Sequence, residues 1–432
     1  MVRIAFHYLG CRLNEAENER IARDLVEAGH QVVSLESHPE VIILNTCGVT
    51  SEAMRKSRNL ARRMAAIGPS VLVLMGCAVD LMASGETPVP DEALRAESRD
   101  EIDVVRIFRD DRPVATRKIL DAIARHWPDD ESESHSIYPL RMRSFIKIQD
   151  GCNNQCTYCS VRLARGRERS ESAASIVSEI RRCLELGERE IVLTGVQLGA
   201  WHEGARHLPE LLQEILSGTS VTRLRLSSIE PWHVRESLWS LWKDARLCPH
   251  FHIPVQSGSD EVLAAMKRRT PLGPYEEKIA AIRQCVPNVR ISTDLIVGFP
   301  GETEAMWRDT MAFLERVQFD DVHLFRFSAR PGTVAASLPD PVPAEEKRRR
   351  WNEAERRIRE IRRARMKRFV GERFRVLWET SGEEHDGMRT WSGYTENYLR
   401  VSRDMASGVE MRGQVTDEIF VENDVSSGEG EG

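Results

Sequence analysis

The residues of this chain best suited to chemistry are three cysteines on one short segment, 151–159. Cys152, Cys156 and Cys159 have the spacing C-x3-C-x2-C and follow the apolar run 145–149. Three thiols on one short loop can converge on a single soft metal centre. A zinc site would need a fourth Cys or His at short spacing, and none follows within the loop. On a four-iron cluster, three ligands leave one iron open, which favours a cluster that binds a substrate.

Three further cysteines follow apolar runs near the N-terminus. Cys11 comes after the run 2–9, Cys47 after 41–46 and Cys77 after 71–76. Residues just beyond the ends of parallel strands share one edge of the sheet, where ligands bind. These thiols can therefore meet, although burial beside apolar strands is an alternative reason for a cysteine at such positions.

The rest of the composition limits the class of protein. The chain has 432 residues, a formal net charge of −6 and nine cysteines. An odd cysteine count without a secretory signal argues against disulfides, and Cys183, Cys248 and Cys285 are interpreted as structural thiols. No apolar run is long enough to cross a membrane, so we expect neither a membrane span nor export.

Alternating strand and helix signals must position these cysteines. The first strands are expected at 2–9, 41–46, 71–76 and 102–108, with helices such as 14–28 and 51–66 between them. Six more are expected at 145–149, 191–195, 224–228, 250–255, 291–298 and 322–328. This predicts a parallel-sheet α/β domain followed by sequential βα units in a partial (β/α)6 barrel. In such barrels the chemistry lies at the C-terminal ends of the strands.

The C-terminal part is expected to be a small antiparallel β-barrel. A helix rich in Arg and Lys is expected at 345–373, and strands at 374–379, 398–402 and 414–421. The predicted domains are 1–135, 138–368 and 371–424, with an acidic linker at 127–134 and a disordered tail at 425–432.

The C-x3-C-x2-C motif resembles that of the radical S-adenosylmethionine (radical SAM) superfamily, including the aromatic Tyr158 before its last cysteine. The resemblance implies a [4Fe–4S] cluster held by Cys152, Cys156 and Cys159. Its open iron would chelate SAM, and electron transfer would cleave SAM to a 5′-deoxyadenosyl radical.

The contexts of Cys11, Cys47 and Cys77 resemble the N-terminal domain of the methylthiotransferase family. There they hold a second [4Fe–4S] cluster, whose free iron holds the sulfur to be inserted. Motifs after the barrel strands follow the family's order, although the second lacks the acidic residue of the usual Gly-Gly-Glu-like SAM contact. The expected contacts to SAM are Tyr158, Gly195, Gln197, Glu230, Gln256, Ser257, Ile296 and Gly298.

The segment 393–401 resembles the TRAM domain, a small RNA-binding β-barrel. Aromatic side chains on such a sheet can stack bases, and Arg and Lys neutralise phosphate. The helix 345–373 could extend this surface, although such a charge run is by itself more typical of a solvated helix face. A second basic cluster after Cys47 comprises Arg55, Lys56, Arg58, Arg62 and Arg63.

Within the family, the segments 191–200 and 227–231 look most like the branch that acts on threonylcarbamoyladenosine in tRNA. The implied reaction uses two SAM molecules and gives a 2-methylthio adenosine next to the anticodon. Implied partners are tRNA, a flavodoxin- or ferredoxin-like electron donor and a sulfur donor, in the cytoplasm.

Other functions stay open. One branch of the family modifies isopentenyladenosine. Another modifies a ribosomal-protein aspartate and usually has acidic residues where this chain has Arg330 and Pro331. A radical SAM enzyme that transfers methyl without sulfur gives the N-terminal cysteines no role. A non-catalytic iron–sulfur RNA-binding sensor would yield no 5′-deoxyadenosine.

Overall fold

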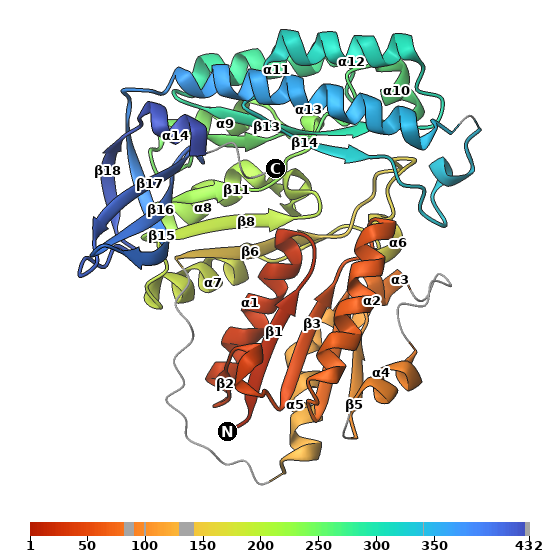
Figure 1. Ribbon diagram of the computed structural model, residues 1–432, viewed down its shortest axis with the longest axis vertical. Coiled ribbons are helices and arrows are strands. Elements are labelled where there is room, and N and C mark those ends of the chain that lie inside the picture. Colours follow the sequence, from red (N-terminus) through yellow and green to blue (C-terminus); the bar gives the residue numbers. More distant parts are fainter. Residues whose placement is uncertain (82–89, 99–100, 129–141, 340, 428–432) are drawn as a thin grey trace. The chain divides into compact units, whose positions relative to one another are not determined.

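The computed structural model describes residues 1–81, 90–98, 101–128, 142–339 and 341–427 in two compact units (Figure 1). The first unit comprises Met1–Leu140, Asp150–Arg169 and Ser328–Ala336, and the second comprises Arg141–Gln149, Ser170–Phe327 and Ser337–Gly432. Most of the predicted linker at 127–134 lies outside the described residues. Of the helices in the described part, none combines the length and the apolar character that a membrane span requires.

The first unit is built on a parallel sheet of five strands in the order β2-β1-β3-β4-β5. Its strands are β1 (Arg3–Tyr8), β2 (Gln31–Val32), β3 (Val41–Thr46), β4 (Val71–Gly76) and β5 (Asp103–Ile107). Its helices are α1 (Arg12–Glu27), α2 (Ser51–Ala66), α3 (Cys77–Leu81), α4 (Asp91–Glu97), α5 (Ala115–His126) and α6 (Val161–Arg165), with 3-10 turns η1 (Leu35–Ser37) and η3 (Arg109–Val114).

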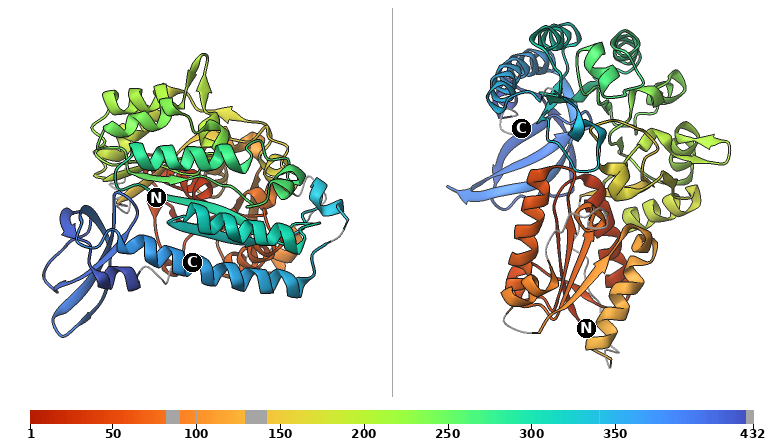
Figure 2. Two further views of the ribbon diagram at one scale, coloured as in Figure 1. Left: turned by 90° about the horizontal axis from the view of Figure 1, so that it is seen from above. Right: turned by 90° about the vertical axis from the view of Figure 1, so that its right-hand side faces the viewer.

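Helices cover both faces of this sheet (Figure 2, right). α1 and α5 pack on one face through Leu25 and Ile119, and α2 and α4 pack on the other through Met64 and Leu94. Every residue of β3 and β4 is buried, which explains their continuous apolar runs. The predicted parallel α/β fold is confirmed here.

The second unit contains the barrel strands in two groups, whose six longer strands pair in parallel. They are β6 (Arg143–Asp150), β7 (Arg169–Ser170), β8 (Glu190–Gly195), β11 (Leu224–Leu226), β12 (His250–His252), β13 (Arg290–Val297) and β14 (Asp321–Arg326). The groups are β11-β8-β6-β7 and β12-β13-β14, and a parallel bridge between Ser228 and His252 joins them. Six of these strands match the predicted ones, so the partial barrel is confirmed.

Helices enclose one side of these strands and form the largest core cluster, which includes Leu295 of β13. They are α7 (Ala173–Glu185), α8 (Leu208–Gly218), α9 (Glu236–Trp239), α10 (Asp260–Ala265), α11 (Leu272–Cys285), α12 (Glu304–Val317) and α13 (Ala344–Lys367). Smaller elements are β9 (His202–Glu203), β10 (Arg206–His207), η4 (Leu198–Ala200), η5 (Pro231–His233), η6 (Ser240–Lys243) and η7 (Val334–Ser337).

The C-terminal part is an antiparallel four-stranded sheet in the order β17-β16-β15-β18. Its strands are β15 (Arg373–His385), β16 (Met388–Thr395), β17 (Arg400–Ala406) and β18 (Val415–Ile419), followed by α14 (Glu422–Ser427). The prediction of a disordered tail that begins at residue 425 is wrong for residues 425–427, which belong to α14. Val425 is buried in the core of this sheet, and Asp424 pairs with Arg403, so these contacts order α14. Residues 428–432 lie outside the described part.

A buried group of arginines, which we call the arginine cluster, surrounds Glu190 at the start of β8. Arg225 donates from Nε to Glu190 Oε1 at 2.7 Å, and Arg223 donates from Nε to Oε2 at 2.9 Å. Arg143 of β6 lies 3.2 Å from Oε1. Burial alone would raise the pKa of Glu190, but Arg225, Arg143 and Arg223 hold that pKa well below its usual range.

The arginine cluster also connects the barrel to the C-terminal sheet of the same unit. Arg143 donates to the Tyr398 hydroxyl and to Glu379, both at 2.6 Å. Arg225 donates to the carbonyl of Glu396 at 3.0 Å and stacks over the Tyr398 ring. The cluster therefore fixes the sheet to the N-terminal ends of the barrel strands.

Candidate functional site

The C-x3-C-x2-C segment forms a tight loop directly after β6. Gly151 has φ +71°, and a Cβ at this position would lie 2.0 Å from the carbonyl oxygen of Arg167. Cys152 N–H donates to the carbonyl of Gly166 at 3.0 Å, which closes the loop. The N–H of Asn154 points at Cys152 Sγ at 3.3 Å. The glycine thus allows the chain to double back and hold the first cysteine in place.

The three thiols of this loop differ in exposure. Cys152 is buried, whereas Cys156 and Cys159 are partly exposed. Tyr158, a predicted SAM contact, is also half-buried. Soft thiols with a backbone N–H directed at sulfur form a donor set that fits an iron–sulfur cluster with one side open to a ligand.

Cys11, Cys47 and Cys77 follow the adjacent strands β1, β3 and β4. Cys11 precedes α1 and is exposed, Cys47 is buried, and Cys77 is the buried first residue of α3. A Cβ on Gly10 would lie 2.9 Å from Cys47 Sγ, so only glycine leaves this thiol its space. Burial, together with the nearby Cys77 and Cys11, raises the pKa of Cys47 to about 12. The structure therefore brings these three thiols together at one edge of the sheet.

Arg165 is the last residue of α6, the helix that follows the C-x3-C-x2-C loop in the chain. Its side chain contacts Cys77. Its Nε donates to Cys77 Sγ at 3.2 Å. Its other nitrogens donate to Glu17 Oε1 at 3.0 Å, Asp150 Oδ1 at 3.1 Å and Asn14 Oδ1 at 2.7 Å. Burial opposes its charge, but Cys77, Glu17 and Asp150 hold the pKa of Arg165 well above its usual range. Arg165 is thus a fixed cation against the Cys77 sulfur.

A second guanidinium, that of Arg112, completes this group. Arg112 donates to Asp80 and lies 3.7 Å from Asp150 Oδ2 and 3.9 Å from Glu17 Oε1. Burial raises the pKa of Asp80 to about 6, against the opposing effect of Arg112. We call Cys77, Arg165, Arg112 and the three carboxylates the thiol network.

Sequence reasoning found the cysteines but missed most of the thiol network. The sequence patterns single out none of its other members and none of their partners, namely Asn14, Glu17, Asp80, Arg112, Asp150 and Arg165. A signal existed in α1, where the polar residues Asn14, Glu17 and Asn18 have helical spacing and are all buried. Buried polar residues on a helix face that starts at a cysteine indicate a site.

The segment Ser328–Ala336 belongs to the same unit as the cysteine loop. Ala335 N–H donates to the carbonyl of Thr157 at 2.8 Å, inside the cysteine loop. Arg330, which stands where the ribosomal-protein branch usually has an acidic residue, is buried and donates to Ser51 at 3.3 Å. Its visible role is to hold this segment against the start of α2.

The predicted SAM contacts of the second unit lie at the C-terminal ends of the barrel strands. Gly195 ends β8, and a Cβ there would lie 3.1 Å from the Gln149 carbonyl oxygen. Gln197 is buried, and its N–H donates to Gln149 Oε1 at 2.7 Å. Glu230, after β11, pairs with Arg268 at 2.6 Å, so its carboxylate already has a cationic partner.

The chain after β12 has an unusual backbone at Gln256, a buried residue with φ +78°. Its N–H donates to the carbonyl of Asp294, and its carbonyl accepts from Ile296 N–H, both at 2.9 Å. Ser257 is fully buried, and its hydroxyl accepts from Ser259 N–H at 3.2 Å. Such strained backbone persists where neighbouring structure holds it, often at functional sites.

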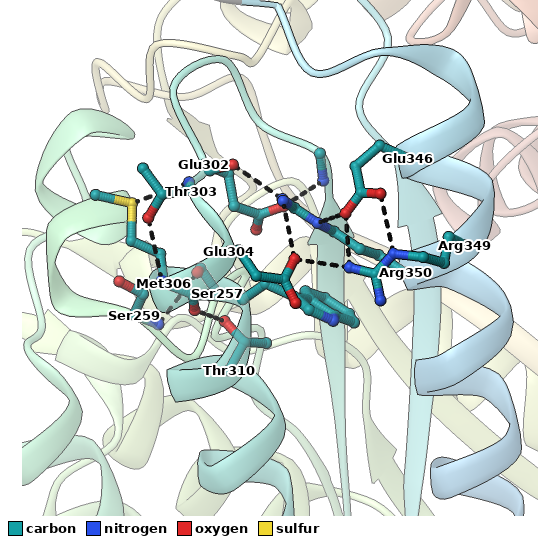
Figure 3. Close-up of polar contacts among 12 residues, drawn as sticks. Ser257, Ser259, Glu302, Thr303, Glu304, Met306, Thr310, Glu346, Arg349 and Arg350 are labelled. Carbon is teal, nitrogen blue, oxygen red and sulfur yellow. Dashed lines mark hydrogen bonds and ion pairs between the residues drawn. The ribbon is translucent and has the colours of Figure 1, made fainter.

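The loop after β13 is held by buried ion pairs (Figure 3). Gly298 has φ +77°, and its N–H donates to Glu302 Oε2 at 2.8 Å. Arg350 of α13 donates to the same oxygen at 2.8 Å and also contacts Glu346 at 2.7 Å. The loop that carries Ile296 and Gly298 is therefore fixed from α13.

The positive charge of α13 is largely used inside its own unit. Its ion pairs join Arg349 to Glu346 and Glu353, Arg350 to Glu302, Arg357 to Glu315 and Glu360, Arg362 to Asp321, and Arg365 and its neighbour Arg368 to Asp320. Tyr394 and Tyr398 likewise stack with Arg143. On α2, by contrast, Arg55, Arg62 and Arg63 are exposed. This helix presents the clearer basic face.

Comparison with known proteins identifies two matching family models. The radical SAM superfamily matches residues 146–314, and the uncharacterized protein family UPF0004 matches residues 3–87. The threonylcarbamoyladenosine tRNA methylthiotransferase MtaB of Thermotoga maritima is 33% identical over 93% of this chain and 91% of its own length. That of Bacillus subtilis is 30% identical over 93% and 90%.

Two other similarities are informative. The tRNA-2-methylthio-N(6)-dimethylallyladenosine synthase of Chlorobium chlorochromatii is 32% identical over 80% of each chain. Among solved structures, the radical S-adenosylmethionine methyltransferase TsrM from Kitasatospora setae covers 75% of this chain and 73% of its own, with TM-score 0.54 and 14% identity. This second likeness concerns the fold alone.

Proposed function

The chain belongs to the radical SAM tRNA methylthiotransferases, and from that premise we propose that its substrate is N6-threonylcarbamoyladenosine next to the tRNA anticodon. Membership of this family makes the chain a transferase and excludes the alternative function of a non-catalytic iron–sulfur RNA-binding sensor. The proposed product is the 2-methylthio derivative. Support for this substrate comes from the relatives named for it, whose similarity extends over 93% of the chain.

We propose two [4Fe–4S] clusters, one held by Cys152, Cys156 and Cys159 and the other by the three N-terminal cysteines. The observation that carries this proposal is the hydrogen bond that Arg165 donates to Cys77. Arg165 lies six residues after Cys159 in the sequence, so both cysteine sets belong to one connected unit. Bound clusters and SAM would supply the reductive cleavage that makes an unactivated C–H bond reactive.

The protein's own residues would position these groups. Arg165 stabilises the thiolate form of Cys77, which a metal ligand must adopt. Ile296 and Gly298 offer backbone at the ends of the barrel strands, where Glu302 and Arg350 keep the loop fixed. We assign Tyr158, Gly195, Gln197, Gln256 and Ser257 to the SAM site. Glu230 would act there through Arg268.

The remaining partners are part of the same proposal. Two SAM molecules would serve one turnover, one as methyl donor and one for reductive cleavage. An electron donor such as a flavodoxin or ferredoxin and a sulfur donor are required. The exposed basic face of α2, which begins four residues after Cys47, is proposed to approach the tRNA backbone. The enzyme would work where tRNA is modified, in the cytoplasm.

Cysteine variants test the division of labour between the two cysteine sets. Cys152→Ala should abolish both 5′-deoxyadenosine and methylthiolated tRNA. Cys47→Ala should keep appreciable 5′-deoxyadenosine formation while losing the methylthio product. Both products are measured by mass spectrometry after anaerobic reconstitution. Cys285→Ala, an exposed cysteine outside both sets, is the matched control and should retain both.

Normal thiolation by the Cys47 variant would contradict the role of the N-terminal set. The substrate is tested by nucleoside analysis of tRNA from cells with and without the protein. Loss of 2-methylthio-threonylcarbamoyladenosine supports the proposal. Loss of the dimethylallyl derivative instead would place the chain with the synthases of the other branch.

A further inference from the structure

A group of two histidines and one aspartate lies on three adjacent barrel strands, outside both cysteine sets. His252 ends β12, Asp294 lies in β13 and His323 in β14. Asp294 and His323 are direct partners in the parallel register, and His252 is the partner of Ser292. α11, α12 and α13 cover the other side of β13 and β14, where Leu295 is packed (Figure 1). The group therefore faces the concave side of the partial barrel.

The ligand atoms of this group converge on one point. His252 Nε2 lies 3.1 Å and His323 Nδ1 lies 3.4 Å from the same oxygen, Asp294 Oδ1. All three ligand atoms lie within 4.8 Å of one another. An ion with metal–ligand bonds of about 2.1 Å separates its ligand atoms by about 3.0 to 3.4 Å, between octahedral and tetrahedral angles.

A neighbouring hydroxyl fixes the orientation of one imidazole. Ser292 Oγ lies 2.9 Å from His252 Nδ1, which leaves Nε2 directed at Asp294. Hydrogen bonds of this kind to the distal ring nitrogen are typical of metal-binding histidines. The Asp294 side chain is mostly buried between the two imidazoles, which places one carboxylate oxygen at the centre of the group.

A hydrogen-bonded His-Asp-His cluster without metal is the competing explanation. The two imidazoles stack at 5.0 Å with an interplanar angle of 24°, and both approach one carboxylate oxygen. The same convergence is expected when one metal ion lies between the three ligand atoms. Zinc binding by wild type and by the ligand variants separates the two explanations.

We propose that His252, Asp294 and His323 bind one divalent transition-metal ion, of the type that prefers imidazole and carboxylate ligands, with zinc as the first probe. Three protein ligands leave at least one position for water or an oxygen of a ligand inside the barrel. The ion would join three strands on the concave side of the barrel. This site goes beyond the methylthiotransferase function and is separate from the cysteine sets.

Zinc content tests the site independently of activity. Protein reconstituted with its iron–sulfur clusters is dialysed anaerobically against micromolar zinc and then against zinc-free buffer, and metals are measured by mass spectrometry. Wild type should retain about one zinc per chain more than His323→Ala at equal iron content. His323 is half exposed in its side chain, so this variant should fold. His385→Ala, which removes an exposed histidine elsewhere, should retain the wild-type zinc content.

Zinc X-ray absorption identifies the ligands. Nitrogen and oxygen neighbours at about 2.0–2.2 Å support the proposal, whereas sulfur at about 2.3 Å assigns the zinc to cysteines and overturns it. Equal zinc in wild type and His323→Ala, or no zinc retained by wild type, also overturns it. Zinc should raise the thermal unfolding midpoint of wild type and His385→Ala but not that of Asp294→Asn. An equal rise in Asp294→Asn counts against the site.

Discussion

The thiol network and the arginine cluster are both buried groups of guanidiniums and carboxylates, but their charges are balanced in opposite ways. In the thiol network, Arg112 and Arg165 serve three carboxylates and the Cys77 sulfur. In the arginine cluster, three guanidiniums converge on Glu190. Among the side chains that are at most 12% exposed, the first region therefore has fewer guanidiniums than carboxylates and the second has more; Arg169 and Glu379, which pair with Asp150 and Arg143, are more exposed.

The pKa values follow from this difference. Burial raises the pKa of Asp80 to about 6, because Arg112 compensates only part of the cost of desolvation. The pKa of Glu190 is well below its usual range, because Arg225, Arg143 and Arg223 outweigh burial. Ionisation of Glu190 thus favours the folded state, whereas ionisation of Asp80 in the thiol network disfavours it.

The largest expected effect is on the arginine cluster. Glu190→Gln would leave three buried guanidiniums without their shared carboxylate. Breaking a buried ion pair typically costs about 3–5 kcal/mol of unfolding free energy. Urea denaturation should show a loss of this size, while the iron content of reconstituted protein stays at the wild-type value.

The matched control for Glu190 is a surface carboxylate that also pairs with arginine. Glu203 pairs with Arg206, and both side chains are exposed to solvent. Glu203→Gln should change the unfolding free energy by less than about 1 kcal/mol. A comparable loss in both variants would show that the three arginines around Glu190 add no more unfolding free energy than a surface ion pair does.

The next effect separates the two regions by their chemistry. Arg165→Met removes the donor to Cys77 Sγ, and it should lower both the iron content and the reduction potential assigned to the proposed auxiliary cluster. The potential falls because a hydrogen bond to sulfur stabilises the more negative, reduced state. The expected loss of unfolding free energy is about 2–3 kcal/mol, since Arg112 remains beside the same carboxylates.

Arg165→Lys is the matched variant for this test. It keeps the positive charge but cannot donate in a planar fork to several acceptors at once. We expect a potential between those of wild type and Arg165→Met, measured by redox titration with electron paramagnetic resonance. An unchanged potential in Arg165→Met would mean that the Cys77 contact has no electronic role.

The parts of the fold predicted from the sequence were those specified by local patterns. β3 and β4 have the predicted bounds because central parallel strands are apolar throughout. β2 has only two residues, and β16 has a glycine, Gly393, within it and no regular apolar alternation, so pairing with neighbouring strands decides both. Non-local pairing of this kind leaves no clear periodic signal in the chain.

The same distinction applies to the sites. The cysteines could be found because soft metals require thiols at characteristic spacings. The partners of Arg165 come from α1 and the end of β6, so only the folded chain brings them together. His252, Asp294 and His323 depend on the register of three strands, which the sequence pattern did not give.

The smallest expected effect tests whether the pKa of Asp80 is raised while that of Glu190 is lowered. The folded-state pKa of Asp80 is about 6, above its unfolded value. Between about pH 4 and 6 the folded protein therefore binds more protons than the unfolded chain, and stability falls as pH rises. Asp80→Asn lacks this titration, so it should gain about 1–3 kcal/mol relative to wild type between about pH 4 and 6.5.

Chemical denaturation of cluster-free protein across this pH range measures the gain, with Asp110→Asn as the exposed control. Glu190→Gln should behave in the opposite sense. The unfolding free energy of wild type should rise relative to that of Glu190→Gln as pH rises towards about 4.5. The reason is that the depressed pKa of Glu190 makes the unfolded chain bind more protons in this range. If Asp80→Asn instead lost ground with rising pH, the Asp80 pKa would have to lie below its unfolded value. The two buried regions would then respond to protons alike.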